Sequence, residues 1–240
     1  MAATLAPSCA ACGHPLDAPS RGCVCPACWS AVDPLPPPLW TDVGITIGAA
    51  GGHYEGALRD IIHAYKYEGR RSLARPLASL MRHAGAALLE DADCIVPVPL
   101  HPWRRLRRGF NQAADLAGEL ATSLDRPVVH ALWRARSTPP QMALPARARR
   151  INVRDAFILS PWSPSIDDRI VVLVDDVRTT GATLNACAKA LKSAGVREVR
   201  ALTVAIAGPP GGRAGADRSR ISPGDPQILS RPAAGACESR

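Results

Sequence analysis

Five apolar residues follow one another without interruption at 170–174, and the carboxylates Asp175 and Asp176 come next. An apolar run without alternation is typical of a strand that is buried on both faces of a parallel sheet. Beyond a short polar loop, apolar residues recur at helical spacing. We therefore predict a strand that ends at the acidic pair, then a loop, then a helix with Thr183 as its N-cap and Gly195 just after its end.

Apolar periodicity divides the rest of the chain into further elements. We expect strands at 41–50, 94–101, 128–133 and 198–207, and helices at 55–67, 73–88 and 113–124. The proline-rich stretch 33–38 separates these elements from a short N-terminal segment. Together with the strand at 170–174, they predict an α/β protein with a mostly parallel sheet flanked by helices.

The loop after the acidic pair carries the groups that a phosphate needs. Hydroxyl donors come from Thr179, Thr180 and Thr183, and Gly181 allows close approach of the backbone. The N-terminus of the following helix adds free N–H groups and the positive end of its dipole. A phosphate held there would place a polyol beside the two carboxylates, which accept hydrogen bonds from hydroxyl groups. The pattern favours a ligand that carries both groups.

Two other interpretations of this stretch stay open. An apolar run that ends in two aspartates is also typical of the magnesium-binding strand of nucleotide-binding P-loop proteins. A P-loop requires a lysine directly after a glycine, and none of Lys66, Lys189 and Lys192 follows one. A purely structural strand with a polar end is the second alternative, although adjacent carboxylates repel each other unless a cation or a hydroxyl group occupies them.

The N-terminal segment has the cysteine spacing of a zinc site. Two CxxC pairs flank a turn-rich stretch, and the expected ligands are Cys9, Cys12, Cys25 and Cys28. Four thiolates at a tetrahedral zinc supply folding free energy that so short a segment cannot obtain from a core, so we expect a closed structural site. Cys23 and His14 are spare donors that either replace a ligand or lie beside the site. A disulfide or redox pair is the alternative.

Composition bounds the class of protein. The chain has 240 residues, is 47% hydrophobic and carries a formal net charge of +8, and only three of its 29 basic residues are lysines. Arginine suits bidentate contacts with phosphate, whether on a nucleotide or on a nucleic acid, although a biased genome also produces such a balance.

No signal peptide and no membrane-spanning stretch is recognisable, so we expect a cytoplasmic protein. A reducing compartment favours metal binding over disulfides for the clustered cysteines.

One group of arginines follows the strand expected at 94–101 and consists of Arg104, Arg105, Arg107 and Arg108. Ligands of α/β proteins bind beyond the carboxyl ends of the strands, so this group and the threonine loop are expected to face one crevice. A diphosphate is one partner for these arginines. A general basic surface patch is the alternative.

Three further stretches have open roles. The aperiodic loop at 137–152 contains Arg147 and Arg150 and is typical of a functional lid or of a disordered segment. Lys66, at the end of the helix at 55–67, is either a functional cation or a solvated one. Residues 208–240 lack apolar periodicity, and we expect them to form a disordered tail.

Residues 171–183 resemble the phosphoribosyl pyrophosphate (PRPP) motif of type I phosphoribosyltransferases. Arg178 departs from it, because that position is often apolar in the motif, and its side chain either reaches the ligand or faces solvent. The CxxC pairs, the stretches 54–69, 97–101 and 108–112, the loop at 141–152 and this motif follow one another in an order that closely resembles the ComF family. The resemblance covers roughly residues 9–206.

The resemblance implies a zinc ribbon at 1–35, a type I phosphoribosyltransferase-like domain at 36–207 and the tail at 208–240. It also implies a PRPP- and magnesium-dependent transfer of ribose 5-phosphate to an unknown acceptor, with release of pyrophosphate. The PRPP-binding residues would be Asp175, Asp176, Val177, Arg178, Thr179, Thr180, Gly181, Ala182, Thr183, Arg104 and Arg108. Asp175, Asp176, Arg147 and Arg150 would act in catalysis.

The same resemblance supports a function of another class. Members of the ComF family are linked to DNA uptake in competent bacteria, and a PRPP-binding fold also serves as a ligand-gated module without catalysis. Such a module would contact DNA or a protein of the competence machinery when PRPP is bound. The scarcity of aromatic residues, 4% of the chain, weakens the case for a reader of single-stranded DNA.

Overall fold

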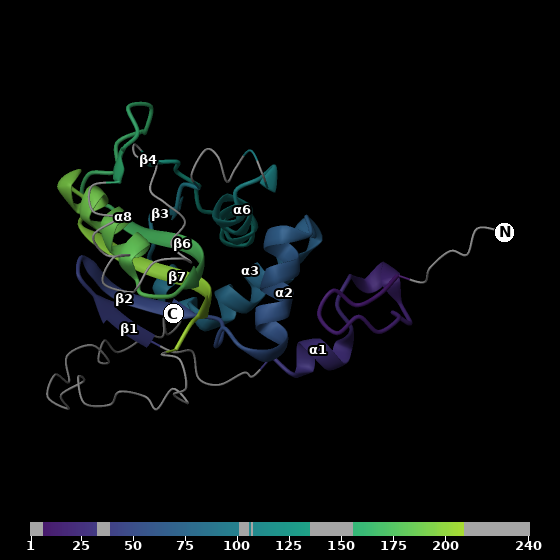
Figure 1. Ribbon diagram of the computed structural model, residues 1–240. Coiled ribbons are helices and arrows are strands. Elements are labelled where there is room, and N and C mark those ends of the chain that lie inside the picture. Colours follow the sequence, from purple (N-terminus) through teal and green to yellow (C-terminus); the bar gives the residue numbers. More distant parts are fainter. Residues whose placement is uncertain (1–6, 33–38, 101–105, 107, 135–155, 209–240) are drawn as a thin grey trace, which may run out of the picture. The chain divides into compact units, whose positions relative to one another are not determined.

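A computed structural model describes residues 7–32, 39–100, 106, 108–134 and 156–208 of the chain (Figure 1). All of them lie in one compact unit, residues 1–208. The boundary expected near residue 35, the loop at 137–152 and the tail beyond Gly208 fall outside the described residues, so the expectations for them stay predictions.

A five-stranded sheet forms the centre of the fold, with the strand order β1-β2-β7-β6-β3. Its strands are β1 (Leu39–Asp42), β2 (Ile45–Ala50), β3 (Cys94–Pro97), β6 (Ile170–Arg178) and β7 (Glu198–Ile206). β2, β7, β6 and β3 pair in parallel, and only β1 pairs antiparallel with its neighbour β2. The predicted α/β fold with a mostly parallel sheet is confirmed.

The single strand expected at 41–50 is wrong, because two antiparallel strands occupy this region. The chain turns between Asp42 and Ile45, where Gly44 has a φ of 79°. A positive φ costs glycine little and other residues much more, so this glycine permits the tight turn. The turn also brings Asp42 close to Arg178 of β6 and Asn185 of α8.

A second, two-stranded sheet consists of β4 (Leu132–Arg134) and β5 (Phe157–Leu159), which pair antiparallel. The strand expected at 128–133 is therefore only partly right: Val128 makes a single bridge with Ile95 at the edge of β3, and the strand proper begins at Leu132 in the other sheet. Trp133 of β4 and Trp162 are both exposed, and their ring centroids lie 5.6 Å apart.

The longer helices are α2 (Gly56–Tyr67), α3 (Ala74–Ala84), α6 (Gln112–Leu124) and α8 (Ala182–Ser193). Shorter ones are η1 (Pro19–Arg21), α1 (Pro26–Ser30), η2 (Arg71–Leu73) and α4 (Ala86–Leu89). The helices predicted at 55–67 and 113–124 are confirmed. The helix expected at 73–88 is interrupted at Gly85, where an added Cβ would lie 2.6 Å from the Leu202 side chain. Among the described helices, none combines the length and the apolar character that a membrane span requires.

The N-cap of α8 is Gly181 and not Thr183 as predicted, so the helix begins two residues earlier than the hydroxyl side chain suggested. Gly181 adopts a φ of 73°, a left-handed conformation that glycine reaches without strain. At the other end, Gly195 follows the helix with a φ of 85°, which confirms the predicted stop.

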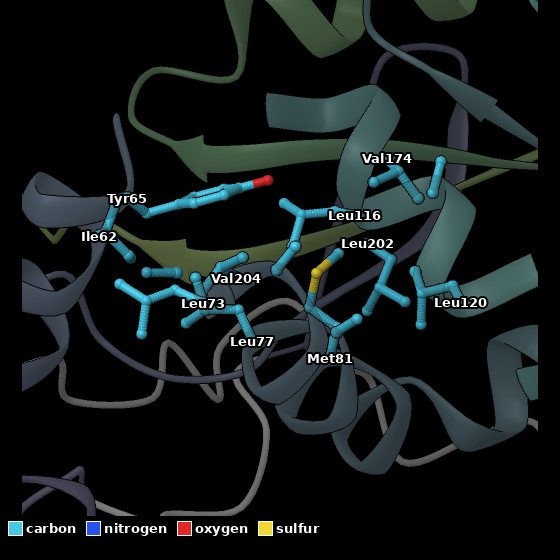
Figure 2. Packing of buried hydrophobic residues seen from close by; sticks show 14 of the residues in the cluster. Ile62, Tyr65, Leu73, Leu77, Met81, Leu116, Leu120, Val174, Leu202 and Val204 are labelled. Atoms are coloured by element: carbon cyan, nitrogen blue, oxygen red, sulfur yellow. The ribbon is translucent and has the colours of Figure 1, made fainter. Parts of the chain in front are cut away.

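The core lies on both faces of the sheet, and β6 contributes to both. Val171 and Leu173 pack in a cluster with α8, whereas Val172 and Val174 pack in a cluster with α2, α3 and α6. Figure 2 shows the second cluster, in which Val174, Leu202 and Val204 of the sheet lie close to Leu77, Met81 and Leu116 of the helices. The predicted burial of this strand on both faces is confirmed, and it follows from the alternation of side chains along a strand.

The cysteine-rich N-terminal segment contributes apolar side chains to the same cluster. Cys9, Val24 and Val32 are buried in it together with residues of α2 and α3, among them Leu58 and Leu77. The segment thus adds to the hydrophobic core on this face of the sheet.

Candidate functional site

A pocket lies where β6 passes into α8. It is lined by Asp175 and by the residues from Val177 to Leu184, which include the threonine loop. β6 continues to Arg178, two residues beyond the acidic pair at which its end was predicted, because its pairing with β7 runs on to Ile206. The structure therefore brings Asp175 and the threonine loop together, as the sequence predicted.

The two carboxylates lie on opposite faces of the sheet. Side chains alternate along a strand, so Asp175 follows Leu173 on the α8 face and Asp176 follows Val174 on the α2 face. The charge of Asp175 raises the pKa of Cys187 in α8, in addition to the larger effect of burial on that thiol. Each carboxylate consequently has its own surroundings.

Asp175 is held as a weak acid. Burial raises the pKa of its carboxyl group to about 7, and the negative charge of Asp176 adds to this effect. One oxygen of Asp175 accepts a hydrogen bond from the backbone N–H of Asp176 at 2.8 Å. A carboxyl group with a raised pKa is protonated more readily, and in its protonated form it is able to donate as well as to accept a hydrogen bond.

Asp176 is paired with a cation from another element. The ammonium of Lys66, in the last turn of α2, lies 2.9 Å from Asp176 Oδ1, and the two side chains are only 12% and 15% exposed. The same ammonium lies 5.9 Å from the centre of the Tyr54 ring. The sequence left open whether Lys66 is a functional or a solvated cation. Its low exposure contradicts a solvated cation, and its ion pair connects Lys66 to Asp176, one of the predicted site residues.

Arg178 connects the threonine loop to the β1–β2 turn. Its Nη2 donates to Asp42 Oδ2 at 3.1 Å, and Asn185 of α8 donates to the other oxygen of Asp42 at 2.8 Å. The guanidinium lies 4.9 Å from the centre of the Trp40 ring, which itself occupies the space that a side chain at Gly48 would need. Sequence reasoning missed this contact of Arg178, because Asp42 is 136 residues away and only the tertiary fold brings it near.

The backbone at Gly181 is close to this ion pair. An added Cβ would lie 2.7 Å from Asp42 Oδ2 and 3.4 Å from the Arg178 guanidinium. Next to it, the hydroxyl oxygen of Thr180 accepts weakly from the N–H of Ala182 at 3.5 Å. The first N–H groups of α8 thus point toward the threonine loop, which lies against the ion pair of Arg178 and Asp42. Free N–H groups at a helix N-terminus are suited to bind an anion.

Arg108 lies four residues before Gln112, the first residue of α6. It donates to the Gln112 side chain at 3.1 Å, and its guanidinium lies 4.8 Å from the centre of the Tyr67 ring. Of the other arginines expected at the site, Arg104, Arg147 and Arg150 lie outside the described residues. The crevice predicted for them stays a prediction.

The expected metal ligands come together in a second cluster. The Sγ atoms of Cys9, Cys12, Cys25 and Cys28 all lie within 4.8 Å of one another. Cys9 and Cys28 are 3.9 Å apart, and Cys12 and Cys25 are 3.8 Å apart. Four sulfur atoms at about 2.3 Å from a tetrahedral zinc are separated by about 3.8 Å. The arrangement fits a zinc ribbon.

Two of these thiols have shifted pKa values, in opposite directions, and burial together with the neighbouring thiols raises the pKa of Cys28. Burial alone would raise the pKa of Cys9, but hydrogen bonds from backbone N–H groups outweigh burial and lower this pKa to about 6. One of them is donated by the N–H of Cys25 at 3.3 Å. Cys23 is not in the cluster, and its thiol lies 3.7 Å from the Ser72 hydroxyl. His14 is not a member of the cluster either.

Comparisons with known proteins identify relatives of this chain. A family model described as "Phosphoribosyl transferase domain" matches residues 106–223. The chain is 39% identical to "Competence protein F" of Haemophilus influenzae over 155 residues, which are 62% of this chain and 68% of that protein. It is 34% identical to "DNA utilization protein YhgH" of Escherichia coli K12 over 175 residues, 68% of this chain and 71% of that protein.

Among solved structures, the orotate phosphoribosyltransferase from Aeropyrum pernix matches with a TM-score of 0.34 and 19% sequence identity. The match covers 62% of this chain and 76% of that one.

Proposed function

The chain belongs to the ComF family, and from this premise we propose that it is a phosphoribosyltransferase that binds PRPP with Mg²⁺ at the junction of β6 and α8. An acceptor nucleophile attacks the anomeric carbon of the ribose, and the bond from this carbon to the pyrophosphate oxygen breaks. Pyrophosphate leaves with the electron pair, and the acceptor loses a proton to solvent or to a nearby base. The product is a ribosyl 5-phosphate derivative of the acceptor.

The convergence of the Asp175 carboxyl group, hydroxyl groups and a helix N-terminus in one pocket supports this proposal. The 5′-phosphate would lie against residues 179–183 and the first N–H groups of α8. Asp175 and Asp176 would bind the ribose hydroxyls. No covalent nucleophile is required of the protein, whose contribution is to position PRPP and to stabilise charge.

Cationic groups would stabilise the leaving pyrophosphate. Magnesium supplies positive charge at the diphosphate when it is bound, since this ion prefers phosphate and carboxylate oxygens. Arg104 and Arg108 would add contacts to the same group. Arg147 and Arg150 would act from the loop at 137–152, which we propose to be a lid over bound PRPP.

The zinc ribbon would be structural. Four thiolates leave no open position on a tetrahedral zinc for a substrate, and the segment packs its apolar side chains on the core. We propose that zinc at Cys9, Cys12, Cys25 and Cys28 stabilises the fold and takes no part in the transfer.

The names of the relatives supply a biological setting. "Competence protein F" and "DNA utilization protein" point to the uptake and use of DNA, so we propose that this chain acts in that process in the cytoplasm. The acceptor would then be a component of nucleic-acid metabolism or of the uptake machinery.

One observation favours the function without catalysis, a PRPP-gated binding module. Trp133 and Trp162 are 47% and 76% exposed and in contact, and exposed aromatic rings stack on nucleobases. In this alternative PRPP changes the affinity for DNA, or for a protein of the competence machinery, and no pyrophosphate is released.

A pyrophosphate-release screen decides between these functions. Wild type is incubated with PRPP, Mg²⁺ and nucleobases, amines or nucleic acids, and a salt titration of DNA binding with and without PRPP is run in parallel. We expect release with one acceptor class, and its loss in a variant with both Asp175→Asn and Asp176→Asn. Asp60→Asn, on the exposed side of α2, is the control. PRPP-dependent DNA binding without release from any acceptor would establish the binding module.

A further inference from the structure

Lys66 compensates the charge of the acidic pair before any ligand is present. Its ammonium and the Asp176 carboxylate are 2.9 Å apart, and both side chains are largely shielded from water. A shielded ion pair is sensitive to the loss of either partner, because the remaining charge is then buried and unpaired. A ligand that replaces Lys66 as the partner of Asp176 must therefore offer another anion to the ammonium.

The ammonium is held on a rigid part of the molecule. Tyr65, one residue earlier in α2, is fully buried, and its hydroxyl donates to the backbone carbonyl of Gln112 in α6 at 3.1 Å. Shortly after α2, Arg71 pairs with Asp115 of α6 at 2.9 Å. The end of α2 is thus fixed to α6 on both sides of Lys66, so a change of partner requires a movement of the lysine side chain rather than of the helix.

This arrangement discriminates between two kinds of ligand. A pentose 5-phosphate without a diphosphate offers hydroxyl groups to Asp176 but no anion beside them, so it exchanges an ionic contact for a neutral one. A pentose with a diphosphate on the anomeric carbon offers an anion next to the 2-hydroxyl. The lysine then exchanges one charged partner for another, and the carboxylate becomes free for the hydroxyl group.

We propose that Lys66 is a specificity-determining residue, which pairs with Asp176 in the free protein and with the diphosphate of the ligand in the complex. The site thereby selects PRPP over ribose 5-phosphate. This inference rests on the proposed binding of PRPP and adds to it a residue from outside the motif at 171–183.

Calorimetry with PRPP and with ribose 5-phosphate, both in the presence of Mg²⁺, tests the proposal on wild type and on Lys66→Met. We expect the variant to lose PRPP affinity by about tenfold or more, the size of one hydrogen bond between charged groups. Its affinity for ribose 5-phosphate stays the same or rises, so the ratio of the two affinities falls about tenfold. Lys66→Arg keeps most of the ratio, and Arg59→Met, an exposed cation on the same helix, keeps all of it.

Folding is checked by urea unfolding, and Lys66→Gln is measured as well, because it keeps a polar side chain without the charge. A proportional loss of both affinities in the folded variants, with the ratio unchanged, overturns the role of Lys66 while PRPP binding stands. Failure of wild type to bind PRPP overturns the proposed function and this inference together. A restored ratio in Lys66→Gln shows that charge is not what selects the ligand, and also overturns it.

Discussion

Arg178 Nη2 lies 3.1 Å from Asp42 Oδ2, so the loop after β6 is tied to the turn between β1 and β2. In the sheet, β2 and β7 separate β1 from β6. The ion pair therefore connects Arg178, one of the residues that line the pocket, to a strand that is not a neighbour of β6 in the sheet. Both side chains are about one fifth exposed, at 18% and 21%, so solvent screens this pair only in part.

Replacing Asp42 with alanine is expected to loosen the threonine loop. The change removes the carboxylate to which the Arg178 guanidinium and the Asn185 amide both donate hydrogen bonds. Urea unfolding should show a loss of about 1–2 kcal/mol, less than for a fully buried pair, and calorimetry should show weaker PRPP binding. Arg178→Met together with Asp42→Ala should cost less than the sum of the single changes.

The exposed pair of Arg197 and Asp168, 3.7 Å apart, is the matched control for Asp42. Arg197→Ala should change stability by no more than about 0.5 kcal/mol. Additive costs for Asp42 and Arg178 would show that the two residues do not act as a unit.

Purified protein is expected to contain one zinc ion per chain. Elemental analysis of a reducing, chelator-free preparation should give close to one equivalent, and Cys25→Ser should lose most of it because a tetrahedral site requires all four thiolates. Cys23→Ser is the control, since this thiol lies outside the cluster and should retain the metal. Less than about half an equivalent in wild type would contradict the site.

The stability of the protein should depend on the protonation of Asp175. Its pKa is raised from 3.8 to about 7 in the folded chain by burial and by Asp176. Between these values the folded state binds the proton more tightly than the unfolded state, so stability falls as pH rises from about 4 to 7 and this effect is complete above 7. The total is at most about 4 kcal/mol.

Asp175→Asn should remove this part of the pH dependence. Urea unfolding of wild type and variant at several values between pH 4.5 and 8 gives the difference in slope. Asp60→Asn should keep the wild-type slope, because Asp60 is exposed. Parallel curves for wild type and Asp175→Asn would mean that Asp175 titrates alike in the folded and unfolded states.

Removal of residues 209–240 should leave the thermal midpoint nearly unchanged. The segment is rich in glycine, proline, serine and arginine and lacks apolar periodicity, so it has little to bury. Differential scanning fluorimetry of the shortened and full chains is sufficient. A drop of more than about 4 °C would show that the segment contributes to the stability of residues 1–208.

The sequence predicted the candidate site where the chemistry is local. The apolar run, the acids, the threonine loop and the start of a helix follow one another along 170–184, and the structure brings the loop and Asp175 into one pocket. The cysteine cluster was equally predictable, because the CxxC spacing fixes which thiols meet. In both places the distance along the chain is short, so residue type and spacing determine the geometry.

Contacts over long distances were not predictable in this way. Lys66 reaches Asp176, and Asp42 reaches Arg178, only because α2 and β1 pack where they do. β5 has three residues, too few to show any periodicity. At Thr183 a favourable capping side chain suggested the wrong helix start, because the left-handed conformation of Gly181 allows α8 to begin earlier.

Trp40 and Gly48 lie opposite each other in the β1–β2 hairpin, and the indole fills the space where a side chain at residue 48 would be. The two positions are therefore expected to covary among relatives of this chain. A residue larger than glycine at the position of Gly48 should be accompanied by a smaller one at the position of Trp40. Such relatives would lack the ring beside the Arg178 guanidinium, and we expect them to carry a different side chain at the position of Arg178 as well.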